Sequence, residues 1–410
     1  MTATAPAPDP IDGLLTPEAV RTRCGEILHV GLGIGLPWFD IDLSKLEDAV
    51  SRVVAEIETN YPDGDVPFHS RWRHFELGGT DLWADIAASH ALSGDDLAIV
   101  AGDLAIVSVL LDAGAGPDWI YTDDATGLRL GRSEGLALAS LRLFESGILS
   151  ADDSDLLRAD ASALSSLSGE KLGRIFQVTD DNPLVGLEQR AGLLRKLGNA
   201  IRKNPSLYMR DDTVRPGNLI PALAARGDLQ ARDILVALLD TLMDIWPSPV
   251  RIDGHPLGDV GRHNALVRSD ATNMIVPFHK LSQWLSYSLI EPLQQSGRTV
   301  SDLDGLTGLA EYRNGGLFVD TGVLTLKDNA VMAAAHSPSS EVIVEWRALT
   351  VALLDRLAEG VRTSLGKSAT DLPLASILQG GTWTAGRKIA AELRPDGGPP
   401  IRLDSDATVF

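Results

Sequence analysis

Residues 96–111 read DLAIVAGDLAIVSVLL and include the most apolar run of the chain. The pentapeptide Asp-Leu-Ala-Ile-Val begins at Asp96 and again seven residues later at Asp103. Seven residues are about two helical turns, so both copies present the same face, and we interpret them as one helix and not as a repeat architecture. Acidic residues bound the run and one lies inside it, which makes it too short and too polar to cross a membrane. The sequence therefore predicts a buried helix here.

Helical periodicity recurs along the rest of the chain. A helix near residues 43–59 is expected to stop before Pro62, and a later one before Pro247. In residues 131–147, Ser133 is the expected N-cap and Gly147 the residue that ends the helix. The expected helices cover residues 43–59, 97–111, 131–147, 231–246, 277–292 and 342–365.

Extended structure is expected in only two short stretches, residues 250–253 and 400–403. No low-complexity linker divides the interior. The sequence therefore predicts a mainly α fold, with a single large helical domain over residues 13–395 and a few short strands. A flexible tail, residues 1–12, is expected before this domain, and an irregular arm, residues 396–410, after it.

Composition limits the classes of partner. The chain has 410 residues, with 56 Asp and Glu against 36 Lys and Arg, and a formal charge of −20. Nucleic acids and anionic membranes attract electropositive surfaces, so neither is an expected partner, whereas a small anionic ligand needs only a few cations. Cys24 is the one cysteine, and the first residues lack the basic and apolar regions of a signal peptide. We expect a cytoplasmic protein, and an oligomer is compatible with this composition.

Polar and aromatic residues crowd into four segments, of which the first is 68–76. It contains Arg71, Trp72, Arg73 and His74. Arginines can clamp a phosphate or carboxylate with two hydrogen bonds while an aromatic ring stacks on a planar group. A salt-bridge network around a buried tryptophan is an equally good interpretation of this segment alone.

The second segment, residues 251–263, places His255, Asp259 and His263 four residues apart. Three such residues on one helix face could bind a metal ion. Proline and glycine within the segment oppose a continuous helix, so a glycine-rich turn, with Asp253 and Asp259 positioning backbone or substrate, is the favoured interpretation.

The third segment, residues 277–285, contains His279, Lys280 and Trp284. Lys280 falls in the first turn of the expected helix, where its ammonium group and the backbone N–H groups can converge on an anion. A lysine at the surface and a structural histidine are the simpler interpretation.

The fourth segment, residues 306–324, contains Glu311, Tyr312 and Arg313 between apolar stretches. A carboxylate in such surroundings has a raised pKa unless a cation such as Arg313 pairs with it.

Motifs in these segments, and two others, resemble the uracil catabolism protein 4 family over nearly the full chain. They are RWRHFE from Arg71, GRSEG from Gly131, RPGN from Arg215, DGHPLGDV from Asp253, PFHKLSQWL from Pro277 and LTGLAEYRNGG from Leu306. The resemblance implies a place in pyrimidine degradation, along a route that opens the uracil ring and proceeds through a ribosylurea-type intermediate toward urea.

A weaker resemblance concerns the chemistry. Segments 131–147, 278–280 and 310–313 are similar, in the same order, to the queuosine salvage proteins, which hydrolyse the N-glycosidic bond of a nucleoside 5′-phosphate. Those proteins resemble the helical, helix-hairpin-helix DNA glycosylases, in which a catalytic Asp opens a helix and a glycine follows eleven residues later. Glu311 and Gly322 have that spacing here. The chain departs from the pattern in having Glu in place of Asp and no clear glycine-rich hairpin upstream.

Together the resemblances imply an N-glycosidase that releases urea from ribosylurea or its 5′-phosphate. Glu311 would stabilise the oxocarbenium-like transition state and activate water, with no metal or organic cofactor. Lys280 and Arg313 would hold a phosphate. The other expected substrate-binding residues are Tyr312, His279 and Trp284. The residues expected to line the leaving-group side are Arg71, Trp72, Arg73 and His74. The residues expected to bind the ribose hydroxyls, or to support those that do, are Glu134, Asp253 and Asp259.

Two other functions fit the same segments. One is an amidohydrolase acting a step earlier, on the ring-opened ureido ribotide, for which a metal ion at His255, Asp259 and His263 would activate water. The other is a protein that binds or channels the intermediate without turning it over. Turnover separates the two classes, because a binding protein is stabilised by the ligand but releases no urea.

Overall fold

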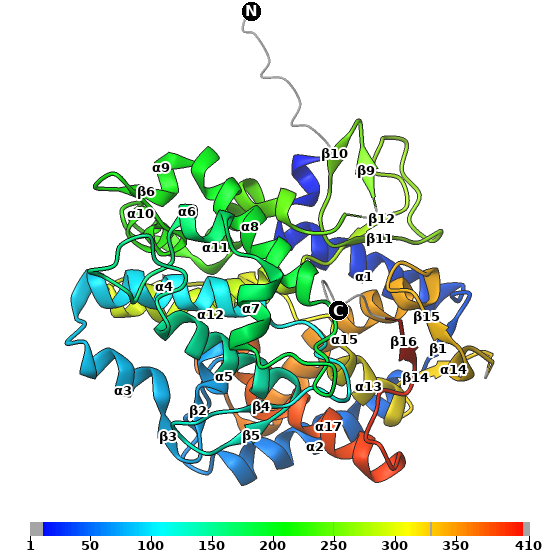
Figure 1. Ribbon diagram of the computed structural model, residues 1–410. Coiled ribbons are helices and arrows are strands. Elements are labelled where there is room, and N and C mark those ends of the chain that lie inside the picture. Colours follow the sequence, from blue (N-terminus) through cyan, green and yellow to red (C-terminus); the bar gives the residue numbers. More distant parts are fainter. Residues whose placement is uncertain (1–10, 249, 329, 405–410) are drawn as a thin grey trace, which may run out of the picture. The chain divides into compact units, whose positions relative to one another are not determined.

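The computed structural model describes residues 11–248, 250–328 and 330–404 (Figure 1). Helices carry most of this part of the chain, and its strands are two or three residues long. Each sheet formed by the described residues has only two strands. The prediction of a mainly α fold with a few short strands is therefore confirmed. The tail predicted for residues 1–12 lies outside the described residues except for its last two, and Asp12 already belongs to a 3-10 turn, η1 (Asp12–Leu14).

The chain divides into two compact units that alternate along the sequence. Unit 1 comprises residues 11–68, 248–280 and 303–404, and unit 2 comprises residues 69–247 and 281–302. The chain passes from one unit to the other four times, which agrees with the lack of an interior linker in the sequence.

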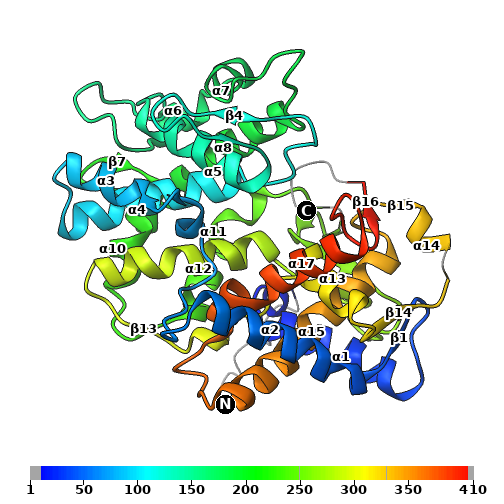
Figure 2. The same ribbon diagram turned by 90° about the horizontal axis from the view of Figure 1, so that it is seen from below.

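Unit 1 is organised around its longest helix, α15 (Glu341–Leu365). Helices α1 (Pro17–Gly33) and α2 (Leu46–Asn60) pack against α15, and Figure 2 shows the three side by side. The other helices of this unit are α13 (Tyr312–Asp320), α14 (Ala330–Ala333), α16 (Leu374–Ile377) and α17 (Trp383–Leu393). Its strand pairs are β1 (Phe39–Ile41) with β14 (Leu324–Leu326), β9 (Arg251–Ile252) with β10 (His255–Pro256), β11 (Val260–Arg262) with β12 (Ile275–Pro277), and β15 (Ala335–His336) with β16 (Arg402–Leu403).

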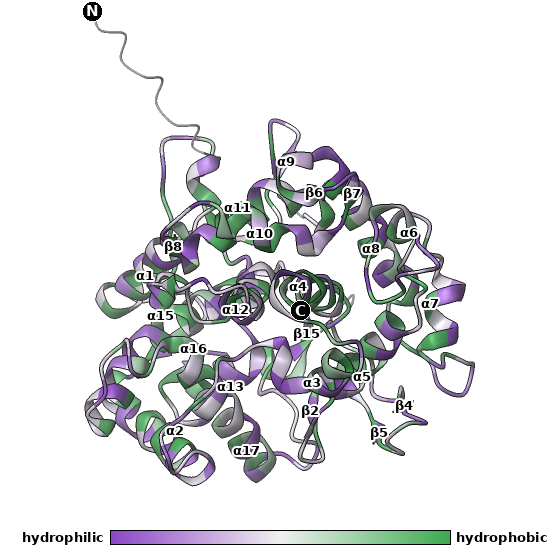
Figure 3. Cartoon of the chain, turned by 90° about the vertical axis from the view of Figure 1, so that its left-hand side faces the viewer, coloured by the Kyte–Doolittle hydropathy of each residue, from purple (hydrophilic) through white to green (hydrophobic). Residues whose placement is uncertain are grey.

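Unit 2 is organised around α4 (Gly94–Leu110), the helix predicted from the repeated pentapeptide. Every residue of α4 from Ala98 to Leu110 is buried, and Figure 3 shows the helix predominantly in the hydrophobic colour. The other helices are α3 (Leu82–Ser89), α5 (Arg132–Glu145), α6 (Ala161–Ser165), α7 (Gly169–Ile175), α8 (Leu187–Lys203), α9 (Pro205–Tyr208), α10 (Leu219–Ala224), α11 (Ala231–Leu242) and α12 (Lys280–Gln295), whose first residue belongs to unit 1. The strand pairs are β2 (Glu76–Leu77) with β3 (Thr80–Asp81), β4 (Tyr121–Thr122) with β5 (Arg129–Leu130), β6 (Met209–Arg210) with β7 (Thr213–Val214), and β8 (Leu229–Gln230) with β13 (Val300–Ser301).

The acid inside the apolar run connects α4 to two loops. The carboxylate of Asp103 is fully buried, and Arg215 donates two hydrogen bonds to it, of 2.8 and 2.5 Å. It also accepts from the backbone N–H groups of Gly217 at 2.6 Å and Ala159 at 3.1 Å. A buried charge needs such partners, and here they fix the Arg215-Pro-Gly-Asn motif against the central helix.

Several helix boundaries differ from those predicted. The N-cap of α5 is Gly131 and not Ser133, which lies inside the helix, whereas Gly147 does follow its end in the left-handed conformation with φ of 73°. Helix α12 begins at Lys280 and continues past Pro292. Pro292 has no backbone N–H and therefore removes one hydrogen bond of the helix. It lies in the last turn of α12 and does not end the helix. In the part of the chain that the structure describes, no helix combines the length and apolar character needed to traverse a bilayer.

Candidate functional site

Glu311 opens a helix in unit 1. It is the N-cap residue of α13, with extended backbone angles of φ −114° and ψ 160°. Its carboxylate accepts hydrogen bonds from the backbone N–H of Arg313 at 2.7 Å and of Asn314 at 2.6 Å. Gly322, eleven residues later, follows the end of α13 with φ of 79°. The local geometry implied by the glycosylase resemblance, with an acid at the start of a helix, is thus present.

The surroundings of Glu311 shift its protonation. Burial raises the pKa of the Glu311 carboxyl above its ordinary value, and this outweighs the opposing effects of the two backbone hydrogen bonds and of the positive charges of Lys280 and Arg313. The residue nevertheless keeps partial solvent exposure. A carboxylate that is desolvated yet reachable is suited to stabilise a developing cation and to accept a proton.

Two residues outside the predicted set support this carboxylate. Asn314 donates from its side-chain amide to the carbonyl of Leu309 at 3.1 Å and accepts a hydrogen bond from Thr382 at 2.8 Å. Thr382 ends a π-helical turn, η7 (Leu378–Thr382), that joins α16 to α17. Such turns are rare and occur often at functional sites. The pair Gly380-Gly381 within an otherwise helical stretch is the sequence signal for this turn.

Arg313 is anchored to the C-terminal arm. Its Nη1 donates to the carbonyl oxygen of Gly397 at 2.8 Å, and its guanidinium carbon lies 4.8 Å from the centre of the Tyr312 ring. Close by, Arg394 pairs with Asp320 at the end of α13 through bonds of 2.8 and 2.5 Å. The arm expected from residue 396 onward is therefore bonded to α13 at Gly397, and its strand β16 pairs with β15. The phosphate-binding role of Arg313 and a ligand role of Tyr312 stay predictions.

The start of α12 is built around an ion pair. Asp259 receives two hydrogen bonds from Arg347, of 2.9 and 2.7 Å, and one from the backbone N–H of Lys280 at 3.0 Å. Burial alone would raise the pKa of Asp259, but the charge and hydrogen bonds of Arg347, together with the Lys280 N–H bond and the electrostatic interaction with His279, lower it, and the net shift is downward. The guanidinium of Arg347 in turn lies 4.0 Å from the centre of the Phe278 ring. Both oxygens of Asp259 are thus bonded to protein groups. This favours a role in holding the start of α12 in place over direct contact with ribose.

His279 belongs to the same structural arrangement. It is buried, has a left-handed backbone with φ of 47°, and its Nε2 lies 3.0 Å from the carbonyl oxygen of Leu14. Burial lowers the pKa of His279, so the ring is neutral near pH 7 and can donate to that carbonyl. These contacts favour the structural interpretation of His279.

The residues considered for a metal ion lie in three different environments. His255 is exposed on β10, after a turn formed by Asp253 and Gly254 with φ of 49° and 83°. His263 is buried with its Nε2 2.8 Å from Glu345, and Asp259 pairs with Arg347. Across the described residues, no group of three or more metal-ligating side chains was found. The expectation of a glycine-rich turn is confirmed, and the binding role of Asp253, exposed at its tip, stays a prediction.

Residues 69–76 of the first segment lie in unit 2, where they include the 3-10 turn η3 (Arg71–His74). Trp72 is buried against Phe75 and Trp83, and its Nε1 donates to the carbonyl of Ser288 at 2.8 Å. Arg73 pairs with Glu291 at 2.7 Å and with Glu76 at 2.9 Å. Trp72 and Arg73 therefore fit the structural interpretation of this segment.

The remaining members of the segment surround Trp284. Arg71 is fully buried; its Nε donates to Ser108 at 2.6 Å, its Nη1 lies 3.1 Å from Asp112, and its guanidinium carbon is 5.6 Å from the Trp284 ring centre. The ring of His74 meets Trp284 edge-on, with centres 5.9 Å apart. Glu134, in the first turn of α5, is close enough to Arg71 to raise its pKa, although burial lowers that pKa more strongly.

Comparison with known proteins now adds to this geometry. A family model with the description "Protein of unknown function (DUF1688)" matches residues 13–410. The chain belongs to this family. Protein urg3 of Schizosaccharomyces pombe is 40% identical, over 97% of this chain and 98% of the relative. Uracil catabolism protein 4 of Lachancea kluyveri is 38% identical, over 91% of this chain and 92% of the relative. The resemblance to the uracil catabolism protein 4 family is therefore confirmed.

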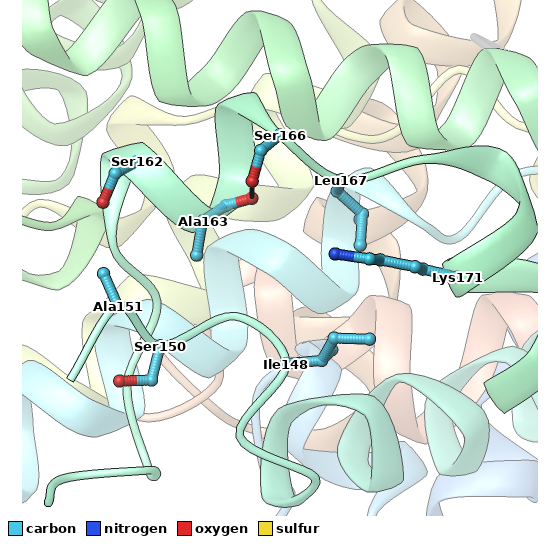
Figure 4. A pocket seen from close by; sticks show the side chains of 8 residues that line it. All are labelled: Ile148, Ser150, Ala151, Ser162, Ala163, Ser166, Leu167 and Lys171. Atoms are coloured by element: carbon cyan, nitrogen blue, oxygen red, sulfur yellow. Dashed lines mark hydrogen bonds between the residues drawn. The ribbon is translucent and has the colours of Figure 1, made fainter. Parts of the chain in front are cut away.

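Two pockets in unit 2 of this DUF1688 member lie away from the predicted residues. One, of about 280 Å³, is lined by three serines, Lys171 and the apolar residues Ile148, Ala151, Ala163 and Leu167 (Figure 4). The other, of about 370 Å³, is lined by residues that include Arg158, Arg210 and Arg215. These arginines already pair with aspartates, namely Asp160, Asp95 and Asp103. Neither pocket contains a residue predicted to bind substrate.

Proposed function

We propose that the protein takes part in uracil catabolism as a hydrolase that cleaves the N-ribosyl bond of ribosylurea or of its 5′-phosphate, releasing urea and ribose or ribose phosphate. Membership in a family with a relative named uracil catabolism protein 4 supports the pathway. The observation that carries the chemistry is Glu311, a desolvated but partly exposed carboxylate at the start of α13.

The reaction balances without a co-reactant other than water. The bond between C1′ and the urea nitrogen breaks with both electrons going to nitrogen, which takes up a proton. Positive charge then develops on the sugar ring, as in other glycosyl hydrolyses, and a carboxylate near C1′ lowers its free energy. Water adds its oxygen to C1′ and transfers a proton to Glu311, which returns it to solvent.

The two backbone hydrogen bonds give Glu311 a fixed orientation for this role. Each carboxylate oxygen accepts one of them, from Arg313 and from Asn314, so the side chain cannot rotate without losing an N-cap bond. Each oxygen has further lone-pair capacity for water or for the charged ring. A carboxylate held in place before the charge forms avoids the cost of reorganisation in the transition state.

Lys280 would hold the 5′-phosphate. The positive charge of Lys280 lowers the pKa of the Glu311 carboxyl, so the ammonium group and the carboxylate interact electrostatically. The backbone N–H of Lys280 is already bonded to Asp259, so the side chain is the part of this residue that would contact the phosphate.

The test is urea release from synthetic ribosylurea and ribosylurea 5′-phosphate, with EDTA present, by wild type and Glu311→Gln. We expect release by the wild type and a loss of roughly 10²–10⁴-fold in the variant. The matched control is Asp81→Asn, which alters another N-cap carboxylate, on α3, and should leave release unchanged. Lys280→Met should raise KM for the phosphorylated compound and not for ribosylurea.

Other outcomes would redirect the assignment. Release that is abolished by EDTA would point to a metal ion at the segment of His255, Asp259 and His263. Thermal stabilisation by both compounds without any release would favour a binding or channelling protein. The first result would overturn the metal-independent mechanism, and the second would overturn the N-glycosidase assignment.

A further inference from the structure

Six buried side-chain nitrogen atoms in unit 2 lack hydrogen-bond partners among the described residues. Three of them are Nη2 of Arg71, Nδ1 of His74 and Nε1 of Trp284. The others are Nη1 of Arg71, which is ion-paired with Asp112, and the Nε atoms of Arg73 and Arg158. The side chains of the first three form one cluster, because Arg71 and His74 both lie within 6 Å of the Trp284 ring centre, at 5.6 and 5.9 Å. Buried polar groups are nearly always paired, and unpaired ones in a cluster indicate a bound molecule or a functional role.

Several polar groups around the cluster make hydrogen bonds that hold its walls in place. The Nε1 of Trp72 donates to the Ser288 carbonyl, and the backbone N–H of Arg71 donates to the Ser288 hydroxyl at 3.0 Å. Ser108, which accepts from Arg71, also shares a 2.5 Å hydrogen bond with Ser140 of α5. The surroundings of Trp284 are thus fixed by α4, α5 and η3.

The charges around the cluster favour an uncharged ligand. The guanidinium of Arg71 is balanced by Asp112 at 3.1 Å, and Glu134 adds a second negative charge nearby. Arg73 is balanced by Glu291 and Glu76. Burial and the neighbouring Arg71 lower the pKa of His74 well below its ordinary value, so this imidazole is neutral. These groups carry no net positive charge, which disfavours an anion, and the unpaired N–H donors of Arg71 and Trp284 disfavour a cation.

The shape of the cluster favours a planar ligand. The rings of His74 and Trp284 stand at 88° to each other, so a flat molecule that stacks on one ring presents its edge to the other. Nε1 of Trp284 and Nη2 of Arg71 only donate, which calls for an acceptor such as a carbonyl oxygen. Nδ1 of neutral His74 can accept from an N–H of the same molecule.

We propose that Arg71, His74 and Trp284 form a binding site for a neutral planar compound of the amide or ureido class, whose carbonyl oxygen accepts from Trp284 and Arg71 and whose N–H donates to His74. The site is built from unit 2 alone and does not depend on hydrolysis by Glu311. His74 is partly exposed, so the cluster reaches solvent at this residue.

The test follows one indole N–H by NMR. The chain has eight tryptophans, and the ¹⁵N–¹H indole signal that disappears in Trp284→Phe belongs to Trp284. N-methylurea serves as the neutral ureido probe, with inorganic phosphate and methylguanidinium as charged probes of similar size. We expect saturable movement of the Trp284 signal with N-methylurea and none with the charged probes.

Two variants and one control complete the experiment. Trp284→Phe keeps an aromatic ring but removes the indole N–H, so N-methylurea binding to this variant is followed by calorimetry and should be about five- to tenfold weaker, as for a lost hydrogen bond. His74→Phe removes the acceptor and should weaken it similarly, which keeps the proposal testable if Trp284→Phe does not fold. Trp119→Phe removes a buried indole donor that is already paired, with the Phe176 carbonyl at 2.9 Å, and should leave the affinity unchanged.

An unmoved Trp284 signal at saturating N-methylurea, or a response to phosphate in its place, would overturn the proposal. The same titration on Glu311→Gln separates it from the proposed hydrolysis. We expect this inactive variant to respond to N-methylurea like the wild type. Urea release by the wild type without any response of the Trp284 signal would support the proposed hydrolysis and exclude the proposed binding site.

Discussion

Thr382 donates a 2.8 Å hydrogen bond to the side-chain oxygen of Asn314, and Asn314 donates its backbone N–H to the carboxylate of Glu311. A π-helical turn near the C-terminus is thereby connected to the acid that opens α13. Both Thr382 and Asn314 are buried. A hydrogen bond in such a place fixes the first turn of α13, because no water can replace a lost partner.

Thr382→Val removes this hydrogen bond while keeping the shape of the side chain. We expect a loss of about 1–3 kcal/mol in the free energy of unfolding, because the Asn314 oxygen is left buried and unpaired. Unfolding is best followed in guanidinium chloride, since urea is the proposed product. Thr363→Val is the matched control, because the exposed Thr363 hydroxyl bonds only to its own helix, and it should cost much less. Equal losses in the two variants would contradict a fixing role for Thr382.

Glu311 makes the free energy of unfolding depend on pH. Its pKa is raised in the folded protein, so the protonated form is favoured by folding, and this contribution is fully present below pH about 4.5 and is lost as pH rises through the folded pKa. The stability of wild type relative to Glu311→Gln should therefore fall as pH is raised from about 4 to 7. Guanidinium chloride unfolding of both proteins across this range measures it, and a relative stability that rises with pH would show the opposite shift.

Asp42 supplies a control of opposite sign. It caps η2 (Leu43–Lys45) from an exposed position, where hydrogen bonds from the Ser44 side chain and backbone lower its pKa. Its contribution is present above the ordinary pKa of the carboxyl and is lost as pH falls through the lowered value. Wild type relative to Asp42→Asn should therefore lose stability toward acid, in the direction opposite to Glu311.

Asp259 and Arg347 are expected to depend on each other. Arg347→Met leaves the buried Asp259 carboxylate without its cation and should cost roughly 3–5 kcal/mol. Combining it with Asp259→Asn should cost less than the sum of the single changes, because the two groups interact directly. Arg210 and Asp95 form an exposed pair 3.5 Å apart, and Asp95→Asn should cost at most about 1 kcal/mol. Additive losses at Asp259 and Arg347 would contradict a coupled pair.

The sequence predicted helices well where their apolar face has a clear period, and less well where tertiary partners set the boundary. The run around Asp103 is the buried helix α4 as predicted, but the arginine that neutralises Asp103 lies 112 residues later, and no local pattern indicates it. Ser133 failed as an N-cap because Gly131 already adopts the extended conformation at the helix start. For the site, the helix-opening position of Glu311 was predictable from the family resemblance. Thr382 and Arg347 were not, since they reach their partners only through the packing of α17 and α15.

Gly386 of α17 tests that packing directly. A Cβ atom at this position would overlap the backbone carbonyl of Arg313, because α17 approaches the first turn of α13 at this residue. Gly386→Ala must therefore separate the two helices, and we expect a loss of about 1–3 kcal/mol together with reduced urea release, since Glu311 caps the displaced turn. Gly25 in α1 has open space around its position, so Gly25→Ala should stabilise the protein by about 0.5–1 kcal/mol through the helix preference of alanine. Chemical unfolding and urea release measured on both variants check this. If Gly386→Ala were as well tolerated as Gly25→Ala, the contact between α17 and α13 could not be what holds Glu311 in place.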